Sequence, residues 1–143
     1  MNRLLTITIV IVAVLFSCHS CKKDTAKTET QSVIQLEGLT LNSTEKWIAN
    51  TETHIGMKRI DSILKNNTAL DGKTLGEVLS KQTSYIIKSC DMTGEAHDQL
   101  HIVLVPILEE ITDIKETENS LVLEEKVTVL QGLIMTYFEY FKT

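Results

Sequence analysis

Residues 120–142 read SLVLEEKVTVLQGLIMTYFEYFK, and this stretch decides the fold that we predict. Six of its apolar side chains recur at regularly alternating steps of four and three residues. These side chains are Leu123, Val127, Leu130, Ile134, Tyr137 and Phe141. Because about 3.6 residues make one turn of an α-helix, they share one stripe of a helix, and that stripe must pack against other helices.

Three earlier segments have the same helical spacing. With the last segment included, the predicted helices span about 43–66, 74–90, 94–117 and 120–142. The first two begin at capping boxes, in which the cap residue precedes a glutamate by three positions. These pairs are Asn42 with Glu45 and Thr74 with Glu77.

The third predicted helix carries the only proline of the chain. Thr93 or Asp91 can cap its start. An interior proline removes one backbone hydrogen bond and crowds the preceding turn. Because the apolar spacing continues in phase beyond Pro106, we expect a kink near Ile102 rather than a break. Asn119 or Ser120 opens the last helix.

The composition also favours helices. The chain has 143 residues with one proline, six glycines and few aromatic residues, whereas a sandwich or barrel needs many turn residues. Four helices of similar length joined by short loops pack most simply as an up-down-up-down bundle. We therefore predict an all-α protein with one four-helix bundle domain at residues 36–143.

The N-terminal residues predict an export signal. Arg3 is followed by a largely apolar run, and LFSC at residues 15–18 resembles the cleavage box of a lipoprotein. We predict a signal peptide at residues 1–17 and a lipid on Cys18, the first residue after cleavage. A plain signal peptide or an uncleaved membrane anchor are the alternatives, although the run is shorter than the about 20 residues of a stable span.

Residues 18–35 are polar and predict a disordered tether. Acyl chains on Cys18 would hold the protein on a membrane, so we expect a lipid-anchored protein of the cell envelope, at the outer membrane or the periplasmic face. Loss of Arg3 with the signal peptide changes the net charge from −5 to −6. The negative net charge gives no electrostatic attraction to nucleic acid, so we expect none as a partner.

Four residues of types that commonly bind metals lie within a stretch of twelve: Cys90, Met92, His97 and His101. Thiol and thioether groups suit copper(I), and imidazole suits copper and zinc. His97 and His101 are four residues apart, so they share one face of a helix and can hold a single ion. A disulfide between Cys21 and Cys90 is an alternative for the thiol, but we expect a free, partly buried Cys90.

The first predicted helix carries a polar stripe where a bundle helix usually shows apolar side chains. It consists of Asn50, His54, Met57 and Asp61. In an up-down-up-down bundle, His54 and His101 lie at a similar distance from the same end of the bundle. The polar stripe can therefore meet the histidine pair, and His54 and Met57 can complete a metal site. Met135 is a possible further neighbour. The alternative is structural, because methionines fill gaps in cores and histidines at the edge of an apolar stripe are usually solvated.

Several chemistries lack their motifs. The segment from His97 to His101 has no glutamate after its first histidine, as a zinc protease requires. The absence of C-x-x-C-H excludes covalently bound haem c. Neither type of phosphate-binding glycine loop is present. We therefore expect no enzyme.

Two segments resemble parts of short, uncharacterised helical lipoproteins of Gram-negative bacteria. One contains Trp47, Ala49, Asn50, Glu52, Thr53 and Gly56, and the other is Gly94-Glu95-Ala96-His97-Asp98-Gln99-Leu100-His101. The resemblance implies a location in the envelope and a bundle fold. It carries no catalytic residue to this chain.

Two hypotheses follow. The first is a membrane-anchored module that binds copper or zinc for buffering, sensing or handover, with a metal donor or acceptor protein as partner. The second is a structural or interaction bundle without a metal, which binds a partner or a second copy of itself.

Overall fold

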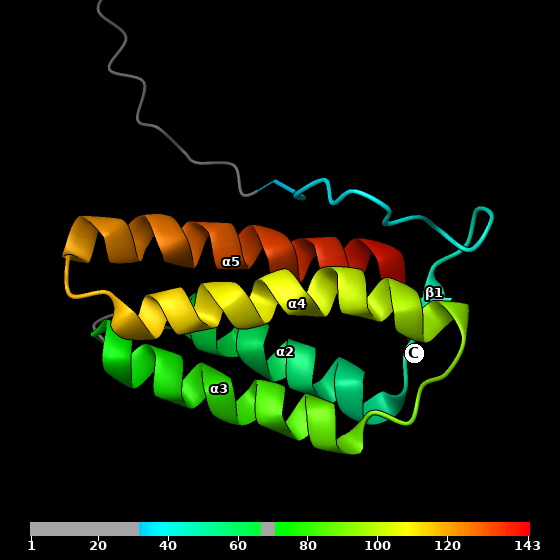
Figure 1. Ribbon diagram of the computed structural model, residues 1–143, viewed down its shortest axis with the longest axis horizontal. Coiled ribbons are helices and arrows are strands. Elements are labelled where there is room, and N and C mark those ends of the chain that lie inside the picture. Colours follow the sequence, from blue (N-terminus) through cyan, green and yellow to red (C-terminus); the bar gives the residue numbers. More distant parts are fainter. Residues whose placement is uncertain (1–31, 67–70) are drawn as a thin grey trace, which may run out of the picture. The chain divides into compact units, whose positions relative to one another are not determined.

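The computed structural model describes residues 32–66 and 71–143. These residues are mostly helical (Figure 1), and their four helices are α2 Thr51–Asn66, α3 Gly72–Ser89, α4 Glu95–Glu116 and α5 Ser120–Tyr140. Each helix packs against the next one along the chain, and α2 also contacts α5. The helices therefore form a four-helix bundle, as predicted.

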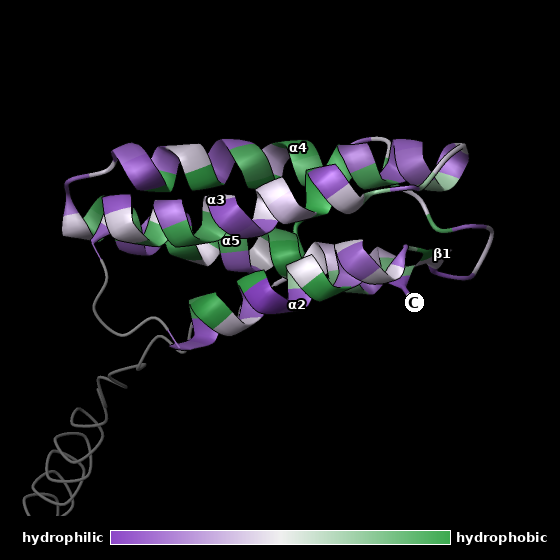
Figure 2. Ribbon diagram, turned by 90° about the horizontal axis from the view of Figure 1, so that it is seen from below, coloured by the Kyte–Doolittle hydropathy of each residue, from purple (hydrophilic) through white to green (hydrophobic). Residues whose placement is uncertain are grey.

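The core is built from the apolar stripes of the helices. In α5, Leu130, Ile134 and Tyr137 are almost completely buried. The stripe of α4 is buried on both sides of Pro106, and the helix runs through this proline without interruption. Figure 2 shows hydrophobic and hydrophilic residues interspersed along every helix, as an amphipathic pattern requires.

The helix caps differ in part from the prediction. Helix α3 is capped by Asp71, whose carboxylate accepts hydrogen bonds from the Thr74 amide at 2.9 Å and the Thr74 hydroxyl at 2.8 Å. Thr74 is therefore not the cap. Helix α4 follows Gly94, which has a φ of 66° and offers no side-chain cap, so the predicted caps at Thr93 and Asp91 are wrong. The cap of α5 at Asn119 is confirmed.

The predicted start of the first helix is also wrong. Asn42 and Glu45 exchange two backbone hydrogen bonds of 2.9 and 3.0 Å across a tight turn, in which Ser43 has a φ of 60°. The sequence pattern taken for a capping box is thus a turn. Helix α2 begins eight residues later than predicted, at Thr51.

The residues before α2 pair instead with the end of the chain. Strand β1, Trp47–Ile48, runs parallel to strand β2, Phe141–Lys142 (Figure 1). The backbone amide of Ala49 continues this pairing by donating to the carbonyl of Lys142 at 2.8 Å. As a result, α5 ends at Tyr140, two residues before the predicted end.

The chain that leads into the bundle lies along α5 (Figure 1). The hydroxyl of Thr136 accepts from the amide of Ile34 and donates to its carbonyl, both at 2.9 Å. A Cβ at Gly132 would lie 2.9 Å from the Ile34 side chain, so only glycine leaves room for this approach. The predicted tether at 18–35 is therefore too long, because the chain already packs on the domain at Ile34.

The predicted signal peptide at 1–17, the lipidation site Cys18 and tether residues 18–31 lie outside the described residues. Among the helices that the structure describes, none combines the length and the apolar character needed to cross a membrane.

Candidate functional site

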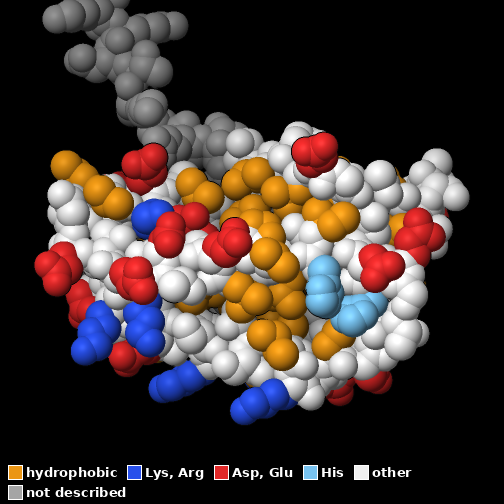
Figure 3. Space-filling model, in the orientation of Figure 1, with side chains coloured by type: hydrophobic (Ala, Val, Ile, Leu, Met, Phe, Trp, Pro, Cys, Tyr) orange, Lys and Arg blue, Asp and Glu red, His pale blue; other side chains and the backbone are white. Residues whose placement is uncertain are grey.

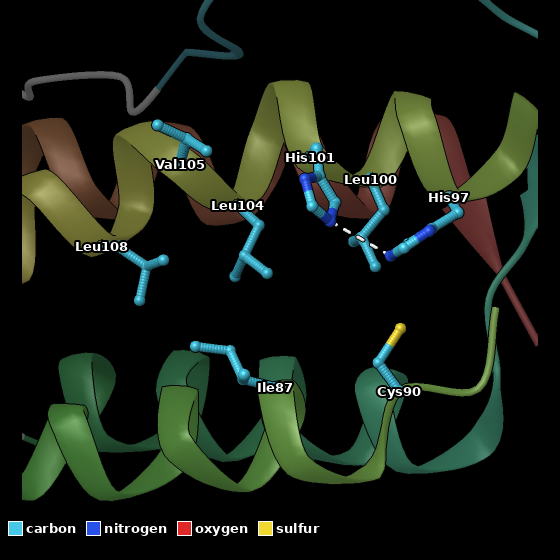
Figure 4. Close-up of a pocket in the computed structure, with 8 residues that line it drawn as sticks. All are labelled: Ile87, Cys90, His97, Leu100, His101, Leu104, Val105 and Leu108. Atoms are coloured by element: carbon cyan, nitrogen blue, oxygen red, sulfur yellow. Dashed lines mark hydrogen bonds between the residues drawn. The ribbon is translucent and has the colours of Figure 1, made fainter. Parts of the chain in front are cut away.

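A pocket of about 420 Å³ opens between the end of α3 and the first half of α4 (Figure 4). Its lining consists of Ile87, Cys90, His97, Leu100, His101, Leu104, Val105 and Leu108. Five of these side chains are aliphatic, and the two imidazoles and the thiol gather at one end (Figure 4). An apolar hollow with a few convergent polar groups is the usual form of a binding site.

The two histidines face each other across one turn of α4. Their Nε2 atoms are 3.0 Å apart, and the rings meet edge to face with centroids separated by 4.5 Å. His97 is half-buried and His101 is exposed. In the free protein this distance allows one imidazole to donate a hydrogen bond to the other, which requires that one accepting nitrogen is unprotonated.

This separation is also close to that of two ligands on one metal ion. Zinc binds imidazole nitrogens at about 2.0–2.1 Å, so two nitrogens on a tetrahedral ion lie about 3.3 Å apart. The Nε2 atoms of His97 and His101 need to move apart by only a few tenths of an ångström to reach this geometry. The pair is therefore close to a chelating arrangement.

Cys90 is the residue that directly follows α3. It lines the pocket, and its thiol is free. Its sulfur points toward the imidazoles in Figure 4. In the part of the chain that the structure describes, however, no three or more His, Cys, Asp and Glu side chains are grouped so that they could hold a metal ion. The structure thus brings together a pair of ligands with a thiol nearby, and not a closed site.

The surface on one side of the pair is apolar. Figure 3 shows the histidines beside a hydrophobic patch on the face formed by α3 and α4. Ile87 is 55% exposed and Val105 is 47% exposed, and both belong to the pocket lining. An ion bound by the histidines would therefore lie at the edge of an apolar surface.

His54 lies elsewhere, between α2 and α5. Its Nδ1 is 3.2 Å from the hydroxyl of Tyr137, and its ring meets Phe138 edge to face. Burial, together with the positive charge of Lys58, lowers the pKa of His54. Burial raises the pKa of Tyr137, and the nearby Cys90 acts in the same direction. His54 has a structural partner and does not line the pocket with His97 and His101.

The remaining residues of the predicted polar stripe also have structural roles. The Asn50 side chain donates to the carbonyl of Ser89 at 2.8 Å and so joins the start of α2 to the end of α3. Met57 is completely buried in the core. Asp61 accepts a hydrogen bond from Lys65 at 2.7 Å. The structure therefore does not bring this stripe to the histidine pair.

Met92 is half-buried and packs against the core, outside the pocket lining. Among the aliphatic residues of the pocket, Ile87, Val105 and Leu108, in contrast, had no place in the sequence prediction. Ile87 and Val105 each directly follow a buried residue, Ile86 and Leu104, and so fall outside the core stripe. An apolar residue out of phase with the stripe was the signal that could have revealed them.

No family model, curated protein or solved structure matches the chain. The resemblance to helical lipoproteins therefore stays a prediction.

Proposed function

We propose that this protein is a lipid-anchored module of the cell envelope that binds a copper or zinc ion through His97 and His101 and buffers it or passes it on. The observation that carries the proposal is the separation of 3.0 Å between the two Nε2 atoms at the mouth of the pocket. The anchor on Cys18 and the up-down-up-down order of the helices belong to the same proposal, the latter supported by the packing of consecutive helices.

A pair of ligands suits transfer better than permanent storage. Copper and zinc bound in proteins commonly have four ligands, of which the pair supplies two. The other positions stay open to water or to the ligands of a donor or acceptor protein. Because His101 is exposed, such a partner can reach the ion directly.

Cys90 influences which metal this site prefers. A thiolate is a soft ligand and favours copper(I) over zinc where it approaches the ion. Since Cys90 lines the same pocket, a movement of the residues after α3 that brings its sulfur to the ion would add it as a third ligand. We therefore expect copper(I) to bind more tightly than zinc and to lose this advantage in Cys90→Ser.

The test is a titration of the full chain in detergent with zinc(II) or copper(I) against a chelating indicator. We expect binding that is lost in His97→Ala/His101→Ala, because both ring nitrogens are removed. His54→Gln is the matched control, since this histidine lies outside the pocket, and it should bind metal as the natural chain does. Affinity that is unchanged in the double variant would refute the proposal.

A non-catalytic interaction bundle is the second candidate. The exposure of Ile87 and Val105 in one patch favours it, because monomers rarely leave such surfaces without a partner. In that case the chain would associate with a partner without metal, and the His97→Ala/His101→Ala variant would associate equally well.

A further inference from the structure

We infer that the histidine pair is half of a metal site, and that the pair of a second copy of this chain completes it. One ion would then lie on a two-fold axis between two α3–α4 faces, held by His97 and His101 of both copies. The inference rests on the proposed function and adds to it the identity of the missing ligands.

The number of ligands points to a second copy. Each chain offers two imidazole nitrogens that are already close to the bite of one ion, and the described residues supply no group of three ligands. A tetrahedral zinc or copper ion needs two more. A two-fold axis through the ion doubles every ligand, so a pair becomes a set of four without any further residue.

The position of the pair also permits this arrangement. His101 is exposed and His97 is half-buried, so an ion on their Nε2 atoms would lie at the open side of the pocket, within reach from outside. Two copies can therefore approach the same ion from opposite sides. A pair at the bottom of a deep cleft would not allow such an approach.

The surface next to the pair suits an interface between copies. Ile87 and Val105 are about half exposed, and they border a hollow that is lined mainly by aliphatic side chains. In Figure 3 the charged side chains lie around the hydrophobic patch and the histidines. Two such faces would bury apolar area against apolar area, which favours association.

The charge balance explains why the metal would control the association. Each chain has a net charge of −5, so two copies repel each other weakly in solution. A divalent cation on the axis opposes this repulsion and joins the two faces. The dimer would hold the ion with all positions filled, and dissociation would open two positions for transfer.

Native mass spectrometry of the full chain, released from detergent micelles with and without zinc(II), tests the inference. We expect twice the monomer mass with one zinc ion per two chains, and a single chain without zinc. His97→Ala/His101→Ala should give only metal-free single chains. Ile87→Lys/Val105→Lys keeps the histidines but places two positive charges in the apolar patch, so we expect no dimer in the presence of zinc.

The alternative outcomes separate the two proposals. One zinc ion on a single chain, sensitive to the histidine substitutions, would overturn the shared site and leave the proposed function standing. A dimer that forms without zinc and persists in the histidine variant would overturn the shared site in favour of an interaction bundle. Absence of zinc from the natural chain in every form would overturn the shared zinc site, and absence of copper(I) as well, in the titration described above, would overturn both proposals.

Discussion

His54 connects the charge state of one side chain to the stability of the bundle. Its imidazole lies against Tyr137 and Phe138, and burial together with the charge of Lys58 lowers its pKa from the ordinary value of 6.5. The unfolded chain therefore binds a proton at a pH at which the folded chain does not. It follows that acid favours the unfolded state at this position.

We predict that the free energy of unfolding falls as the pH decreases below about 6.5, and that this fall is smaller in His54→Gln, since glutamine does not titrate. Urea denaturation at a series of pH values measures the effect. Lys58→Met should also reduce the fall, because it removes the charge that lowers the pKa of His54. Identical pH profiles for the natural chain and His54→Gln would contradict the prediction.

At the candidate site, spacing along the sequence was sufficient to predict where some residues lie, but not others. The step of four residues between His97 and His101 places both on one face of α4, whatever the rest of the fold. For His54 and Met57 the sequence gives a height along the bundle, but not the direction in which the helix faces. Helix α2 turns Met57 into the core and His54 toward α5, away from the pocket.

At the scale of the elements, α2 and α3 approach each other closely at Gly56. A Cβ at this position would collide with the side chain of Ile86, which is itself completely buried and cannot move aside. Alanine has a higher helix propensity than glycine, but the collision occurs in the packed core. Packing therefore outweighs propensity at this position.

We predict that Gly56→Ala lowers the free energy of unfolding by about 1–3 kcal/mol, the usual cost of overpacking. Thermal or urea denaturation followed by circular dichroism measures it. Ser84→Ala, at an exposed position of α3, is the control and should stay within about 0.5 kcal/mol of the natural chain. An increase in stability with Gly56→Ala would show that the two helices separate easily.

Helices with a long apolar stripe could be predicted from the sequence, whereas the turn and the strand pairing next to them could not. The periodicity of residues 120–142 is local, and it predicted α5 to within two residues at its end. The pattern from Asn42 to Glu45 is also local, but a turn and a capping box can share it. The residues that follow this turn, Trp47 and Ile48, pair with Phe141 and Lys142, almost a hundred residues away, and no local pattern reveals such partners.

At the scale of the whole molecule, the last residues close one end of the bundle. Phe141 is 1% exposed, and its ring stacks on Tyr137 at a centroid distance of 5.1 Å. The next residue, Lys142, accepts a hydrogen bond from Ala49 through its backbone and binds Glu45 through its side chain at 2.8 Å. These contacts attach the segment before α2 to α5.

We predict that deletion of residues 141–143 lowers the free energy of unfolding by about 3–5 kcal/mol, because a buried phenylalanine is lost together with the strand pairing. The midpoint of urea denaturation reports the loss. Deletion of Thr143 alone is the control and should leave the midpoint unchanged, since this residue is exposed. A similar small effect of both deletions would mean that the strand pairing contributes little.

The contacts at the two ends of the domain also set the order of events during its synthesis. Ile34 bonds to Thr136, 102 residues further along the chain. At roughly 5–20 residues per second, a ribosome makes Thr136 about 5–20 s after Ile34. During this interval the segment before α2, including β1, lacks its partners in α5 and β2. This end of the domain therefore closes only after α5 and β2 have been synthesised.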